Sequence, residues 1–127
     1  MADVDRLEHI LELIDDVHRY ANVQTGRAPY DQNELVRTWV RHKILLIGEA
    51  SDHVSEEIRA RYPDVPWRVI KGMRNRLVHG YDQVDDDIVW TTVVESLPDL
   101  RVQIDAALAQ ERLREERSQR NGPSRHE

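Results

Sequence analysis

The sequence predicts an all-α fold, an up-and-down four-helix bundle with a short extra helix or a kinked last helix. Three observations favour it: apolar residues recur at helical spacing through most of the chain, aromatic residues make up only 6% with no phenylalanine, and charged residues make up 33%. A β-sandwich usually draws on more aromatic and β-branched residues. A chain of 127 residues can bury one helical core without disulfides.

The first half of the chain predicts two long helices. Over residues 4–21, apolar side chains recur every three or four positions between charged ones, which is the spacing of one buried helix face. Gly26 and Pro29 then break the pattern. Asp31, followed three positions later by Glu34, resembles a capping box and is expected to open a second helix that runs to about residue 54.

A third helix is predicted over 66–79. It follows a short helical turn at 55–62 and begins where Pro66 ends an extended passage, with Asp64 as the expected cap. We expect it to stop at Gly80, because glycine can take the left-handed conformation that closes a helix.

The remaining sequence predicts a fourth helix and a tail. The acidic run over 82–87 is expected to cap that helix rather than bind a divalent cation, since it lacks the ligand pattern and glycine of a calcium loop. Pro98 should kink the helix or start a fresh segment. We therefore expect one domain over 1–113 and a disordered, charged tail over 114–127, where the apolar periodicity ends.

Composition and charge limit the classes of function. Lysine and arginine number 18 against 24 acidic residues, and the formal net charge of −6 has the wrong sign for a protein that coats nucleic acid without selectivity. With no cysteine, the chain has no disulfide, thiolate metal site or cysteine nucleophile. No apolar run is long enough for a membrane span or a signal peptide, so we expect a cytoplasmic protein without a membrane partner.

The predicted third helix carries a local reversal of charge. Between Trp67 and Val78 there is no acid, and the cations are Arg68, Lys71, Arg74 and Arg76. On a helical wheel, an arc of about 80° opposite the apolar side chains contains Arg68, Lys71, Asn75 and His79. An imidazole, an amide and a guanidinium can therefore meet around one phosphodiester, with Arg68, Lys71 and Arg76 as further phosphate contacts. The alternative is an ordinary solvated basic face with a histidine that complements the helix dipole.

The string from Met73 to Tyr81 resembles the Arg-x4-His-x-Tyr signature of the HepT family, within the HEPN superfamily. The residues that match it position by position are Arg74, Asn75, His79 and Tyr81. The segment 47–50, the passage 62–67 and the Leu97-Pro98 joint are also similar to this family, so the resemblance covers most of the chain.

The resemblance implies an HEPN-like bundle that dimerises with its two motifs facing each other, and a ribonuclease activity that needs no metal ion or other cofactor. It also implies a nucleotidyltransferase antitoxin as partner. The chain would then be the toxin of a type VII-like HEPN/MNT toxin–antitoxin pair, with RNA as its substrate. In some members of the family the antitoxin adenylylates the motif tyrosine, which here is Tyr81.

The residue types suit this chemistry. RNA carries its own nucleophile, the 2′-hydroxyl, so cleavage needs a base, an acid and positive charge for the phosphorane. Histidine can serve as either base or acid, and two chains related by a twofold would supply two copies of His79. Arg74 would hold the phosphate, and Asn75 would orient the scissile group or His79.

The sequence leaves alternatives open for several residues and for the function itself. Glu49 either pairs with a motif arginine across the bundle or stays solvated. Core or dimer-interface anchors are expected at Trp39, Trp67 and Trp90. The competing functions are a non-catalytic HEPN subunit that regulates a nucleotidyltransferase or presents Tyr81 to it, and a plain helical interaction module.

Overall fold

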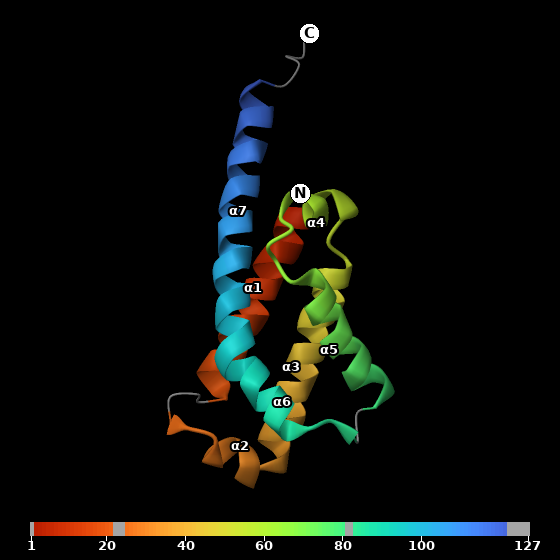
Figure 1. Cartoon of the computed structure of the whole chain (residues 1–127). Helices are drawn as coiled ribbons and strands as arrows, with labels where there is room; N and C mark the ends of the chain where they lie inside the picture. Colours follow the sequence, from red (N-terminus) through yellow and green to blue (C-terminus); the bar gives the residue numbers. More distant parts are fainter. Residues whose placement is uncertain (1, 22–24, 81–82, 122–127) are drawn as a thin grey trace.

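The structure, a computed structural model, describes residues 2–21, 25–80 and 83–121. In this part of the chain all regular secondary structure is helical, which confirms the predicted all-α bundle. The long helices are α1 (Ala2–Tyr20), α3 (Glu34–Asp52), α5 (Trp67–His79) and α7 (Leu97–Arg120). Helix α1 packs against both α3 and α7, and α5 packs against α3 (Figure 1). No helix among the described residues is long and apolar enough to cross a membrane.

Short helices join the long ones. Helix α2 (Ala28–Gln32) precedes α3, and α4 (Glu56–Arg61) lies between α3 and α5. Helix α6 (Asp86–Thr91) and a π-helical segment, η3 (Thr92–Ser96), lead directly into α7. The Asp85 side chain accepts a hydrogen bond from the backbone N–H of Asp87 (2.8 Å), so the acidic run caps α6 as predicted. Pro98 lies in the first turn of α7, directly after the π-helical segment, and the backbone stays helical through this joint, so Pro98 does not start a separate segment.

The N-terminus of α3 is capped by Asn33, and the prediction of Asp31 as its cap was wrong. The Asn33 side chain accepts hydrogen bonds from the backbone N–H groups of Leu35 (2.9 Å) and Val36 (3.2 Å). Asp31 lies instead in α2, which begins at the residues expected only to break the first helix. Asparagine and aspartate are comparable N-caps, so the pattern could not decide between two such residues two positions apart.

Both ends of α5 also differ from expectation, although its bounds agree. Pro66 occupies the N-cap position and no side chain caps the helix, so Asp64 does not have the predicted role. Gly80 follows the helix with a φ of −143°, outside the left-handed region. Among the described glycines, Gly26 has the positive φ, at 92°. Gly80 therefore ends α5 without the conformation that only glycine adopts easily.

The core is one cluster of buried apolar side chains shared by α1, α3, α5, α6 and α7. Its fully buried members include Leu7, Ile10, Ile14, Val40, Ile47, Leu77, Val93 and Ile104. The three tryptophans, Trp39, Trp67 and Trp90, pack against this core while staying partly exposed. The helices are thus held together by interdigitating aliphatic groups, as the spacing of apolar residues predicted.

Helix α7 continues past Leu113 to Arg120, so residues 114–120, which the sequence pattern assigned to a tail, are helical. The buried Glu111 accepts hydrogen bonds from Tyr62 Oη (2.6 Å) and Arg61 Nη1 (2.7 Å), which join α7 to the end of α4. Burial and the hydrogen bond to Glu111 raise the pKa of Tyr62 to about 12. Residues 122–127 lie outside the described part of the chain.

Candidate active site

Helix α5 separates apolar and basic side chains as predicted. Leu77 is buried in the core, and Ile70 and Met73 pack against it. The exposed side chains of the helix include Arg68, Lys71, Arg76 and His79. The basic face is therefore open to solvent along the length of the helix.

Gly48 lets α3 and α5 approach closely at the motif arginine. A Cβ atom at Gly48 would lie 2.3 Å from Arg74 Cβ and 2.7 Å from Arg74 Cγ, far inside ordinary contact distance. Gly48 is buried, and both clashing atoms belong to the stem of the arginine rather than to its flexible end. Any larger residue at this position would push the two helices apart. The contact therefore sets where the Arg74 side chain leaves α5.

Arg74 is held by two neighbours. Its Nε donates to Glu49 Oε1 (2.7 Å), and its Nη1 donates to Asn75 Oδ1 (2.9 Å). The hydrogen bond that Arg74 donates to Glu49 raises the pKa of the guanidinium further above its usual value. Of the two interpretations of Glu49, the structure shows the pairing with a motif arginine across the bundle. These contacts engage two of the three guanidinium nitrogens and leave Nη2 without a hydrogen-bond partner among the described residues.

The structure brings Asn75 to Arg74 rather than to His79. His79 lies one helical turn beyond Asn75 on the same side of α5, and its side chain is exposed. Within the described part of the chain, no hydrogen bond joins the two side chains, and the Asn75 oxygen accepts from Arg74. In the single chain Asn75 therefore orients the arginine. Tyr81, the last residue of the motif, lies outside the described residues.

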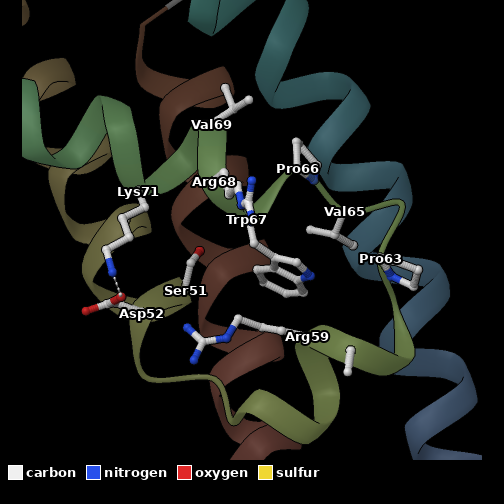
Figure 2. Close-up of a pocket in the computed structure, with 12 residues that line it drawn as sticks. Ser51, Asp52, Arg59, Pro63, Val65, Pro66, Trp67, Arg68, Val69 and Lys71 are labelled. Carbon is white, nitrogen blue, oxygen red and sulfur yellow. Dashed lines mark ion pairs between the residues drawn. The ribbon is translucent and has the colours of Figure 1, made fainter.

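The three expected phosphate contacts are exposed side chains of α5. Lys71 Nζ lies 3.8 Å from Asp52 Oδ1, and the lysine side chain is the more exposed of the two. Arg68 and Arg76 have no ion-pair partner among the described residues. Arg68 and Lys71 line a cavity together with Arg59 of α4 (Figure 2). Sequence reasoning missed Arg59, because it lies in a short helix without a chemical motif.

The described residues include no group of three or more histidine, aspartate or glutamate side chains that could hold a metal ion. The polar groups that α5 presents are a guanidinium, an amide, an imidazole and nearby cations. These groups can bind a phosphate, orient it and transfer protons.

Comparison with known proteins agrees with this geometry. The family model described as "Ribonuclease HepT-like" matches residues 10–107, which include Gly48, Glu49 and the whole of α5. The chain belongs to the HepT-like ribonuclease family. A protein of Caldanaerobacter subterraneus subsp. tengcongensis with the printed name "Putative RNase" is 34% identical over 110 residues, which cover 84% of this chain and 94% of that protein.

Other relatives carry similar names. A Methanocaldococcus jannaschii protein, also named "Putative RNase", is 30% identical over 99 residues, covering 78% of this HepT-like chain and 90% of its own. A "Probable ribonuclease HepT" of Thermococcus cleftensis is 39% identical over 56 residues, covering 44% of this chain and 51% of that protein. No solved structure matches the chain. The predicted family is thus confirmed.

Proposed function

We propose that this HepT-like protein is the toxin of a type VII-like HEPN/MNT toxin–antitoxin pair, and that it cleaves RNA without a metal ion. The observation that carries the proposal is the arrangement on α5. Arg74 is fixed by Glu49 and Asn75, and the exposed His79 follows five positions later, about 7.5 Å along the helix axis. A phosphate contacted by the arginine would lie within reach of the imidazole.

The reaction is a transesterification within the RNA. A base removes the proton of the 2′-hydroxyl, the oxygen attacks the adjacent phosphorus, and the bond from phosphorus to the 5′-oxygen breaks as an acid protonates that oxygen. The products are a 2′,3′-cyclic phosphate and a 5′-hydroxyl. Arg74 stabilises the charge of the phosphorane, and its position is set before substrate arrives because Glu49 and Asn75 hold it. Further phosphates of the RNA are bound by Arg68, Lys71 and Arg76.

A homodimer completes the site. One chain offers a single motif histidine, whereas a twofold dimer with facing α5 helices offers two copies of His79, one as base and one as acid. Val78, next to His79, is 46% exposed, so an apolar side chain at the end of the motif is available to a second copy. We expect this dimer to work in the cytoplasm.

The antitoxin would be a nucleotidyltransferase that transfers AMP from ATP to Tyr81, with release of pyrophosphate. Tyr81 lies two residues past His79 in the sequence. An AMP group there would bring a negative charge to the cations of α5 and occupy the place of a substrate phosphate. Mass spectrometry after co-expression should find mass added in whole AMP units on the peptide with Tyr81. An unmodified but inactive toxin would contradict this form of neutralisation.

The test of the nuclease compares His79→Ala with His42→Ala, which removes an exposed histidine from α3. The purified proteins are incubated with RNA in excess EDTA, and the product ends are analysed. We expect wild type and His42→Ala to leave cyclic phosphate ends, and His79→Ala to lose at least about a hundredfold in rate, the lower range for a general acid or base. The same variants expressed without antitoxin report growth inhibition.

Two results would overturn the proposal. One is undiminished cleavage by a His79→Ala protein whose circular dichroism shows it to be folded. The other is cleavage that depends strictly on added magnesium. A well-folded monomer that keeps full activity at assay concentration, seen by sedimentation, would refute the shared site alone.

A further inference from the structure

A cavity of about 640 Å³ opens beside the first turns of α5. It is walled by the C-terminal end of α3, by α4, and by the passage through Pro63, Val65 and Pro66, and the indole of Trp67 lies in it (Figure 2). The volume is within the usual range for small-molecule sites. The proposed reaction at Arg74 and His79 does not occupy this space, although Arg68 and Lys71, which are proposed to bind further phosphates, line its edge.

The lining combines an aromatic ring with an excess of positive charge. The Trp67 indole Nε1 donates to the backbone oxygen of Tyr62 (3.0 Å), which fixes the plane of the ring while leaving it partly exposed. The cations among the described lining residues are Arg59, Arg68 and Lys71, and the acid is Asp52, which lies 3.8 Å from the lysine nitrogen. The guanidinium groups of Arg59 and Arg68 have no carboxylate partner among the described residues. The cavity is thus locally cationic in a chain of net charge −6.

This composition selects a class of ligand. A planar base can stack on an indole, and its phosphate can receive hydrogen bonds from guanidinium groups. A cation would be repelled by the two unpaired arginines, and an uncharged apolar ligand would leave them unsatisfied. A nucleotide supplies both a base that stacks on the indole and a phosphate that pairs with the arginines.

The cavity lies next to the motif arginine. Gly48 lines the cavity and is also the residue against which the stem of Arg74 packs, because a Cβ there would lie 2.3 Å from Arg74 Cβ. Arg68 precedes Arg74 by six positions, about 9 Å along the helix axis. An extended strand that follows α5 can therefore place one nucleotide against Trp67 and a neighbouring phosphate at Arg74.

We propose that the cavity around Trp67, Arg59 and Arg68 binds one unpaired nucleotide of the RNA, next to the phosphate that Arg74 holds. This inference rests on the proposed function, because it names a second subsite for the same substrate. The base must be unstacked to enter, so the site selects single-stranded RNA over duplex.

Binding is measured separately from cleavage to test the subsite. A His79→Ala protein in which Trp39→Phe and Trp90→Phe leave Trp67 as the single tryptophan is titrated with a short single-stranded RNA of mixed sequence. We expect Trp67 fluorescence to be quenched by this RNA, and much less by the same strand with abasic residues or by the duplex, because quenching needs a base on the ring. Circular dichroism checks that the triple variant is folded.

Charge variants test the cationic wall. Arg59→Gln and Arg68→Gln should each weaken RNA binding about tenfold, as expected for the loss of a charge-assisted contact. The matched control is Arg19→Gln, which makes the same charge change at the C-terminal end of α1, at the opposite end of the bundle from α4 (Figure 1). The control should bind RNA as the parent protein does.

Cleavage of the same RNA by the wild-type protein is measured in parallel. The two results together distinguish a failure of the subsite from a failure of the nuclease. Cleavage without quenching of Trp67, with affinity unchanged in Arg59→Gln, overturns the subsite and leaves the nuclease standing. Quenching that is lost in Arg59→Gln, without cleavage by wild type, supports the subsite and contradicts the nuclease. If RNA is neither bound nor cleaved, both are overturned.

Discussion

Two clusters in this molecule each pair an arginine with a carboxylate, but they differ in what covers them. The first is the Arg74 cluster, with Glu49 and Asn75, at the contact between α3 and α5. The second is the Arg41 cluster, in which Arg41 Nη2 and Tyr30 Oη both donate to the same oxygen of Asp86, each over 2.6 Å. Both clusters lie on α3, about two turns apart, since Arg41 and Glu49 are eight residues from each other.

The two clusters differ in how far other side chains cover them. Tyr30 is fully buried and packs against Trp90 with ring centroids 5.4 Å apart, so the Arg41 cluster joins α2, α3 and α6 under an aromatic cover. The Arg74 cluster instead stays half-exposed beside the open cavity and one turn from the exposed His79. An arginine–carboxylate pair thus stabilises the fold where other elements cover it, and remains available to a phosphate where it faces solvent.

The largest expected effect on stability and activity comes from adding a side chain at Gly48, where α3 and α5 are in close contact beside Arg74. Gly48→Ala places a Cβ 2.3 Å from Arg74 Cβ, so α3 and α5 must separate. We expect a loss of about 1–3 kcal/mol in the free energy of unfolding, typical of overpacking, together with loss of RNA cleavage. The matched control is Gly72→Ala on α5, where nothing lies within 4 Å of the added Cβ. The control should gain up to about 1 kcal/mol in urea denaturation; equal stability of the two variants would contradict the tight contact.

Asp86→Asn should affect stability and spare activity. The change weakens the hydrogen bonds that Asp86 accepts from Arg41 and Tyr30, and we expect a cost of about 1–2 kcal/mol because the pair is only partly exposed. RNA cleavage at a temperature where the variant is folded should match wild type. A stable Asp86→Asn protein with impaired cleavage would reverse the roles assigned to the two clusters.

Glu49→Gln should lower RNA cleavage and leave stability nearly unchanged, the opposite of Asp86→Asn. Without the carboxylate, Arg74 loses the partner that holds its Nε, and we expect kcat for RNA cleavage to fall about tenfold to hundredfold, as for a misplaced catalytic group. The midpoint of thermal unfolding should hardly change, because exposed ion pairs contribute little. Glu49→Asp, which keeps the charge on a shorter side chain, should recover part of the loss. Wild-type kcat in Glu49→Gln would show that Glu49 does not position the arginine.

The smallest effect is a difference in pH dependence. Burial disfavours the charged form of Asp86, but hydrogen bonds from Tyr30 and Arg41 outweigh it, so its pKa lies below the usual value in the folded protein. A lowered folded pKa gives stability that is complete above the unfolded pKa of about 3.9 and is lost as the pH falls through the folded value. The stability difference between wild type and Asp86→Asn should therefore shrink below about pH 4 in urea titrations. A difference that stays constant down to strong acid would contradict the lowered pKa.

The sequence by itself determined the helical class, the bounds of α5, the division of that helix into buried and basic sides, and the motif from Arg74 to Tyr81. These features depend on residue order alone, because helical periodicity relates neighbours three and four positions apart. Helix caps were harder to predict, since Asn33 and Asp31 are nearly equivalent in isolation and only the packing of α2 decides between them.

Only the tertiary structure decided which groups meet across helices. Glu49 and Arg74 are separated by 25 positions in the chain, and their contact depends on the close approach that Gly48 permits. Arg59 of α4 and Arg68 of α5 line one cavity with Trp67, and no local sequence pattern predicts that they meet there. Local spacing cannot encode such contacts, because they arise from the way helix faces interlock when the shared core is buried.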